Sequence, residues 1–233
     1  MEYTTVIAEL RTHASAAHKA RVIRLGIPEA QSLGVPMPEI RRIARNVIRS
    51  AGRSNDLAHD LWATGIHEAR LLAALVCGPA TLPLEEAAAL IDDVVSWDLC
   101  DHLCKNLYLH LPDRELLIAR WWDAEPLYTR RAAFALIASI ATHERALDHD
   151  SITSFLTWIE DAAEDPRPHV HKAVEWSLRE VGQRNIELRD RALAVAERLR
   201  VSPNTSKSRV GRLASKLLSS LVEAEGRRRL VTA

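Results

Sequence analysis

The sequence contains little of what several protein classes require. Its 233 residues include three cysteines, an odd number without regular spacing, which excludes a disulfide framework and indicates a reducing setting. No run approaches the roughly 20 apolar residues of a membrane-spanning helix. The opening residues, MEYTTVIAELRTH, lack the basic and apolar regions of a signal peptide. We therefore expect a protein of the bacterial cytoplasm or nucleoid, with no membrane partner.

Strand patterns are nearly absent as well. Alternating runs rich in Val, Ile and Thr do not recur, whereas apolar residues at helical spacing recur along the whole chain. The clearest examples are PEIRRIARNVIRS, HEARLLAALVCG, PLEEAAALIDDVV, RRAAFALIASIATH, SITSFLTWIEDAAED, HVHKAVEWSLREVGQRN, RDRALAVAERLR and KSRVGRLASKLLSSLVEAE. The sequence predicts an all-α protein with a single domain over residues 1–222 and a basic C-terminal tail over 223–233.

The predicted helices are weakly repetitive. Aligning Arg70, Asp101, Arg131 and Lys172 gives steps of 31, 30 and 41 residues. Two helices with their turns fill about 30–45 residues, which is the period of HEAT-like repeats. The pattern favours a HEAT-like helical-repeat solenoid, in which inner helices turn these four positions toward one concave surface. A non-repetitive helical bundle is the alternative.

Net charge is formally zero, but the charges are unevenly distributed. Residues 39–53 hold five arginines and one acid, and residues 200–233 hold eight Lys or Arg against two acids. Such segments can present a basic face to a polyanion even when the total charge is zero. Ordinary solvated helix faces would give the same composition.

The segment SWDLCDHLCKN, residues 96–106, combines residues that suggest several kinds of chemistry. Cys100 and Cys104 fall on the apolar stripe of a predicted helix, and no second pair of ligands follows them at zinc spacing. A disulfide within one helical turn is geometrically poor. We therefore expect buried, unreactive thiols and no metal or other cofactor. Asp98 is interpreted as a surface or helix-start acid.

Trp97 and Asp101 of this segment are four residues apart, so they share one helix face. If the repeat register holds, the same concave surface receives Arg131, Lys172, Trp176 and Arg179. Cations and indole rings suit phosphates, sugars and bases. A carboxylate repels phosphates, so its presence on this surface points to a chemical role. In the alternative interpretation, Asp101 and Arg131 form a structural ion pair and both tryptophans belong to the core.

Four blocks of the sequence carry a resemblance to a known family. They are LGVPMPEIRRIAR (33–45), SWDLCD (96–101), YTRRAAFALI (128–137) and VHKAVEWSLREVGQRN (170–185). Together, in this order, they resemble the AlkD-like DNA alkylation-repair proteins, across nearly the whole chain. The resemblance implies an all-helical HEAT-like solenoid with a concave DNA-binding face. It also implies a DNA glycosylase that hydrolyses the N-glycosidic bond of cationic N3- or N7-alkylated purines with the base still stacked.

The resemblance also assigns roles to individual residues. The aromatic–x–x–x–Asp pair of the family falls on Trp97 and Asp101, its arginine on Arg131 and its second tryptophan on Trp176, which we take as the catalytic set. Two departures are visible. Ser96 stands where the compared enzyme has an aromatic residue, and RVIRLGIPEAQSLGV lacks the aromatic contact to DNA expected near the N-terminus. Further cations expected to contact DNA are Arg130, Lys172, Arg179, Lys105 and Arg212.

The chemistry is consistent with these roles. Alkylation makes the purine a cationic leaving group, so what remains is to stabilise a sugar with oxocarbenium character and to place a water molecule. One ionised carboxylate, Asp101, suits both tasks. The expected partner is double-stranded DNA carrying alkylated purines, bound by a monomer. The alternatives are a catalytically silent DNA-structure binder on the same scaffold and a HEAT-like protein-interaction module.

Overall fold

The computed structural model describes residues 2–144 and 149–231, without the side chains of 149–151 and 222–231, and the described residues contain helices and no strand. The chain divides into two compact units, residues 1–115 and 116–233. None of the described helices is long and apolar enough to cross a membrane. The all-helical prediction is confirmed.

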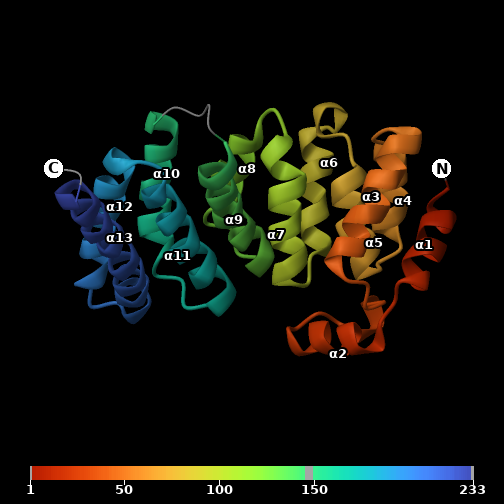
Figure 1. Ribbon diagram of the computed structural model, residues 1–233, viewed down its shortest axis with the longest axis horizontal. Helices are drawn as coiled ribbons and strands as arrows, with labels where there is room; N and C mark the ends of the chain where they lie inside the picture. Colours follow the sequence, from red (N-terminus) through yellow and green to blue (C-terminus); the bar gives the residue numbers. More distant parts are fainter. Residues whose placement is uncertain (1, 145–148, 232–233) are drawn as a thin grey trace. The chain divides into compact units, whose positions relative to one another are not determined.

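The first unit contains seven α-helices among its described residues, which are labelled α1 to α7 in Figure 1, and short 3-10 turns lie between some of them. The helices are α1 (Tyr3–Thr12), α2 (Ala16–Arg24), α3 (Met37–Ala51), α4 (Asn55–Ala63), α5 (His67–Val76), α6 (Leu84–Ala89) and α7 (Trp97–Asn106). The 3-10 turns are η1 (Glu29–Gln31), η2 (Pro79–Thr81), η3 (Leu90–Asp93) and η4 (Tyr108–His110). Helix α3 packs on α5, and α5 packs on α7, which forms one layer of the unit.

The second unit begins within α8 (Arg114–Trp121), which crosses the boundary between residues 115 and 116. The remaining helices are α9 (Leu127–His143), α10 (His149–Ala162), α11 (Pro168–Gln183), α12 (Ile186–Arg200) and α13 (Thr205–Val231). Helix α11 packs on α9 and on α12, and α13 packs on both α11 and α12. The backbone of α13 continues through residues 223–231 of the predicted tail, whose side chains lie outside the described residues.

The helix starts show the predicted repeat directly. Helices α5, α7, α9 and α11 follow the N-cap residues Ile66, Ser96, Pro126 and Arg167, which are 30, 30 and 41 residues apart. Asp101, Arg131 and Lys172 each stand five residues after their N-cap. Arg70 stands only four after its own, so the predicted alignment was shifted by one residue there and Leu71 is the equivalent position.

Arg70 corresponds instead to Arg130, and the two arginines make matching contacts. The Nε–H of Arg70 donates to the Trp62 carbonyl at 3.2 Å, and that of Arg130 donates to the Trp122 carbonyl at 3.1 Å. Each guanidinium also pairs with an aspartate that precedes the next helix of the series. We call these contacts the Trp62 clasp (Trp62, Arg70, Asp93) and the Trp122 clasp (Trp122, Arg130, Asp165). Each joins consecutive helices within its own unit.

The buried carboxylate of Glu68, at the start of α5, holds the segment that precedes α3. It accepts hydrogen bonds from the Ser32 hydroxyl and from the backbone N–H groups of Leu33, Gly34 and Val35, at 2.7–3.2 Å. Gly34 has φ +85°, and a Cβ there would lie 2.5 Å from the Ser15 carbonyl oxygen. This close approach brings the start of α2 against the segment.

Candidate functional site

Helix α7 carries the first half of the predicted site. Its N-cap, Ser96, accepts a hydrogen bond from the Leu99 N–H at 3.4 Å and starts the helix at Trp97. The stripe of Leu99, Cys100, Leu103 and Cys104 is buried. Trp97 and Asp101 are half-buried and stand one turn apart, as predicted from their spacing.

The prediction that Cys100 and Cys104 are buried is confirmed. Cys100 and Cys104 have no exposed surface, and neither forms a disulfide. Cys77 is buried too, and burial raises the pKa of its thiol. Within the described part of the chain, no group of three or more His, Cys, Asp or Glu is arranged to hold a metal ion.

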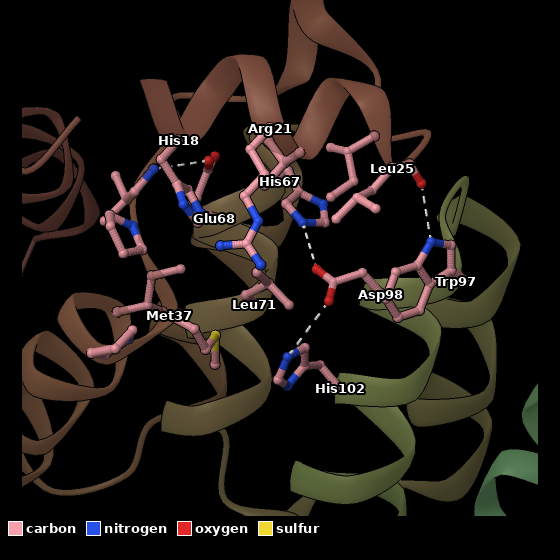
Figure 2. Close-up of a pocket in the computed structure, with 16 residues that line it drawn as sticks. His18, Arg21, Leu25, Met37, His67, Glu68, Leu71, Trp97, Asp98 and His102 are labelled. Atoms are coloured by element: carbon pink, nitrogen blue, oxygen red, sulfur yellow. Dashed lines mark hydrogen bonds and ion pairs between the residues drawn. The ribbon is translucent and has the colours of Figure 1, made fainter. Parts of the chain in front are cut away.

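Trp97 is fixed by a long-range contact. Its indole N–H donates to the backbone carbonyl of Leu25, just after α2, at 3.1 Å (Figure 2). The ring therefore cannot rotate freely about its side-chain bonds without losing this hydrogen bond. It also forms one wall of a cavity of about 370 Å³ within the first unit.

This cavity lies between α2, the start of α3, and the first turns of α5 and α7. Most of its walls are apolar, and its polar walls come mainly from His18, Arg21, His67, Glu68, Asp98 and His102. This cavity was not predicted from the sequence. The sequence of α2 and of the segment that follows it has no pattern from which their position beside this cavity could be predicted.

Asp98 lies inside this cavity rather than on the outer surface, although it does stand in the first turn of α7. Its carboxylate is 3.0 Å from His67 Nε2 and 3.7 Å from His102 Nε2 (Figure 2). Burial acts to raise the pKa of Asp98, but the hydrogen bond with His67 and the nearby histidine charges outweigh it, so the pKa is lowered. Burial, against the attraction of Asp98, lowers the pKa of His102. Near neutral pH the cluster therefore holds an ionised Asp98 beside a neutral His102.

The second half of the predicted site lies on α9 and α11. Arg131 is 5% exposed, and its guanidinium donates to the backbone carbonyl of His169 at the start of α11. Trp176 is half-buried, and its indole N–H donates to Glu180 Oε1 at 3.1 Å. Trp97 and Asp101 belong to the first unit, whereas Arg131 and Trp176 belong to the second, so each pair is described within its own unit.

The predicted DNA contacts fall into two groups. Lys105 on α7, Lys172 on α11 and Arg212 on α13 are exposed. The other two residues make ion pairs within the second unit. Arg130 pairs with buried Asp165 at 3.2 Å in the Trp122 clasp, and Arg179 Nε lies 2.6 Å from Glu175.

A family model described as DNA alkylation repair enzyme matches residues 6–218. No curated protein matches the chain. A solved structure from a new family of proteins related to the HEAT-like repeat DNA glycosylases, with affinity for branched DNA structures, superposes with a TM-score of 0.76. It has 19% sequence identity and covers 84% of this chain and 83% of its own.

Weaker similarity extends to a designed armadillo repeat protein in complex with a (KR)4 peptide. Its TM-score is 0.40 at 16% identity, over 87% of this chain and all of the designed one. The solved relative of the HEAT-like glycosylases supports the fold, and the family model covers nearly the whole sequence. The chain belongs to the DNA alkylation repair enzyme family.

Proposed function

We propose that the protein is a DNA glycosylase that hydrolyses the N-glycosidic bond of cationic N3- or N7-alkylated purines in duplex DNA, with the base left in the stack. The observation that carries this proposal is the pairing on α7. Trp97 and Asp101 share one partly exposed face, and the Trp97 ring is already fixed by its hydrogen bond to Leu25. Family membership over residues 6–218 supports the same assignment.

In the proposed reaction, Asp101 acts on the sugar. As the bond to the cationic purine lengthens, positive charge develops on the deoxyribose, and a nearby carboxylate stabilises it and orients the attacking water. The base departs without protonation because alkylation has already made it a good leaving group. Trp97 and Trp176 are assigned to the faces of the sugar, where aromatic rings attract developing positive charge.

The cations are assigned to the phosphates. Exposed Lys105, Lys172 and Arg212 are proposed to hold phosphates of the duplex, since charge-assisted hydrogen bonds fix its position. Arg131 is 5% exposed and donates to the His169 carbonyl, so its proposed contact with the phosphate beside the lesion requires this side chain to turn outward when DNA binds. Arg130 and Arg179 are assigned a supporting role at this surface because both already make ion pairs within the second unit.

The test replaces the proposed catalytic carboxylate. Asp101→Asn should reduce the release of 7-methylguanine from methylated duplex DNA by about 10-fold or more, because the amide cannot stabilise the sugar cation. Affinity for the duplex should be retained. Asp92→Asn, at an exposed position preceding α7, is the matched control and should leave release unchanged. Release that is equally fast in Asp101→Asn and the wild type would remove the proposed role.

A second candidate function is a silent binder of DNA structure. The similar solved structure comes from a family with affinity for branched DNA. In that case the wild type would excise no purine from methylated DNA and would bind a four-way junction more tightly than a linear duplex of the same length. Chromatography of released bases, together with a binding competition between the two DNAs, separates the two candidates.

A further inference from the structure

Helix α3 bears a row of exposed arginines outside the proposed catalytic set. Arg41, Arg45 and Arg49 are four residues apart, so they line one face of the helix. All three are exposed, whereas Ile40, Ile43, Ala44 and Val47 on the opposite face are buried. The row is therefore a continuous cationic strip held on a well-packed helix.

The charge of the row is not neutralised within the protein. Among residues 2–144 and 149–231, no ion pair or hydrogen bond involves the guanidinium groups of Arg41, Arg45 and Arg49. The acid of the same helix, Glu39, is engaged by the remaining arginine, Arg42, at 2.8 Å. Arg42 also approaches Glu9 at 3.5 Å. One helix thus holds three arginines turned to solvent and one tied to acids.

The row begins near the proposed catalytic helix. Ile40, the residue before Arg41, lines the same cavity as Trp97 and His102 of α7. Helix α3 also belongs to the same layer of the first unit as α5 and α7. A strip that starts there and extends along α3 continues outward from the site.

We propose that Arg41, Arg45 and Arg49 form a phosphate-binding track that holds one strand of duplex DNA beyond the lesion. The track is about 12 Å long at 1.5 Å of rise per residue. Phosphates of one strand advance by about 3.4 Å along the duplex axis, so the track spans three to four nucleotides. This inference rests on the proposed function only for the choice of DNA as the partner.

The number of phosphates contacted is measurable from salt dependence. Each neutralised phosphate adds about 0.9 to the slope of log affinity against log salt concentration. The variant R41Q/R45Q/R49Q should therefore lower that slope by about 2.7 for an unmodified duplex, measured by fluorescence anisotropy. Between 50 and 200 mM salt, the variant should lose about 40-fold less affinity than the wild type.

Two further variants make the result specific. R42Q removes a cation of the same helix that is already paired with acids, and it should leave the slope unchanged. R41K/R45K/R49K keeps the three positive charges, so it should have the wild-type slope. A lower slope in the glutamine variant alone would then be due to the lost charges. Unfolding temperatures of all variants are compared with the wild type before binding is measured.

The outcomes separate this inference from the proposed function. If the slope falls by about 2.7 but no variant, nor the wild type, releases a purine, the track stands and the glycosylase assignment fails. If purines are released but the slope of the glutamine variant equals that of the wild type, the track is wrong. A row that binds an acidic protein or an anionic membrane instead would give this second result. Equal slope losses in R42Q and the triple variant would also overturn the track.

Discussion

At the residue scale, Glu68 shows how a charged side chain acquires a structural role. Sequence alone marks HEAR as the start of a helix and says nothing of the partners of its glutamate. The carboxylate is 2% exposed and accepts four hydrogen bonds from residues 32–35. Leu33, Gly34 and Val35 open the block LGVPMPEIRRIAR, so a motif that suggests a family also depends on a distant acid. Local periodicity cannot reveal this pairing because it joins residues about 35 positions apart.

Replacement of this carboxylate tests its contribution to stability. Glu68→Ala should lower the free energy of unfolding by about 3 kcal/mol, because it leaves three backbone N–H groups and a hydroxyl without their acceptor. Glu68→Gln keeps one acceptor oxygen and should cost less. Urea denaturation gives the free energies, and hydrogen exchange of the Leu33 and Gly34 amides reports the local loosening. Glu29→Ala, at an exposed position, should change stability by less than about 0.5 kcal/mol; an equal loss there would refute the role of Glu68.

At the element scale, close helix crossings explain two of the glycines. A Cβ on Gly182 of α11 would lie 2.6 Å from Leu218 Cδ2 of α13. A Cβ on Gly211 of α13 would collide with the backbone of α12 at Ala196 and Arg200. The second contact is with main-chain atoms, which cannot rotate out of the way. The spacing of α12 and α13 is therefore set by the absence of a side chain.

Gly211→Ala is the corresponding prediction. Intrinsic helix propensity alone would make this change favourable by about 1 kcal/mol. The crossing predicts the opposite sign, a loss of about 2–3 kcal/mol in the free energy of unfolding, because α12 and α13 must move apart. Arg212→Ala, the neighbouring exposed position of the same helix, is the control for a general effect of alanine. Stabilisation by Gly211→Ala, measured by thermal or urea unfolding, would contradict the crossing.

The helices also show where periodicity succeeds. Helices α3, α5, α9, α11 and α12 follow the predicted segments closely because each is rich in buried apolar residues, and α9 is buried on all its faces from Arg131 to Ala141. Helix α2 was not predicted, and it buries no residue at all. The predicted helix PLEEAAALIDDVV is instead divided into α6 and the 3-10 turn η3. Apolar periodicity predicts a helix only where burial selects the residue types along it.

At the scale of the whole molecule, acid should weaken the fold through identifiable groups. The pKa of His102 is lowered in the folded protein, so the unfolded chain takes up a proton first as pH falls below about 6.5. The free energy of unfolding therefore decreases as the pH falls from about 6.5 to the lower pKa that His102 has in the folded protein. The pKa of Asp98 is also lowered, so its contribution is present above its ordinary value of 3.8 and is lost only as pH falls through its folded pKa.

His102→Gln should therefore flatten the fall in unfolding free energy between pH 7 and pH 5. The effect of a single proton is limited to about 1.4 kcal/mol per pH unit. Urea denaturation across this range gives the slope, and His143→Gln, at an exposed position, provides the comparison. A slope that is the same in His102→Gln and the wild type would show that this imidazole is not the group responsible.

The parts of the site that could be predicted are those formed by residues close together in the sequence. The shared face of Trp97 and Asp101 needed only a four-residue spacing on one helix, and it was found. The cavity was missed because its walls come from α2, residues 27–38, α5 and α7. The hydrogen bond between Trp97 and Leu25 joins residues 72 apart. The joint surface of the two proposed catalytic pairs, and the single domain over residues 1–222, stay predictions.

The two clasps have a consequence for how such a chain can diversify. The Trp62 and Trp122 clasps recur with 60 residues between their tryptophans, and the position on α7 that corresponds to Arg70 and Arg130 is Cys100. The corresponding position on α11 is His171, so the arginine of the clasp is present on α5 and α9 and absent from α7, which bears Asp101, and from α11. Substitutions on the exposed face of α7 leave the contacts of both clasps in place, because the clasp arginines lie on α5 and α9. The arginines of the clasps and the pair of Trp97 and Asp101 therefore lie on different helices, so each set can change without the other.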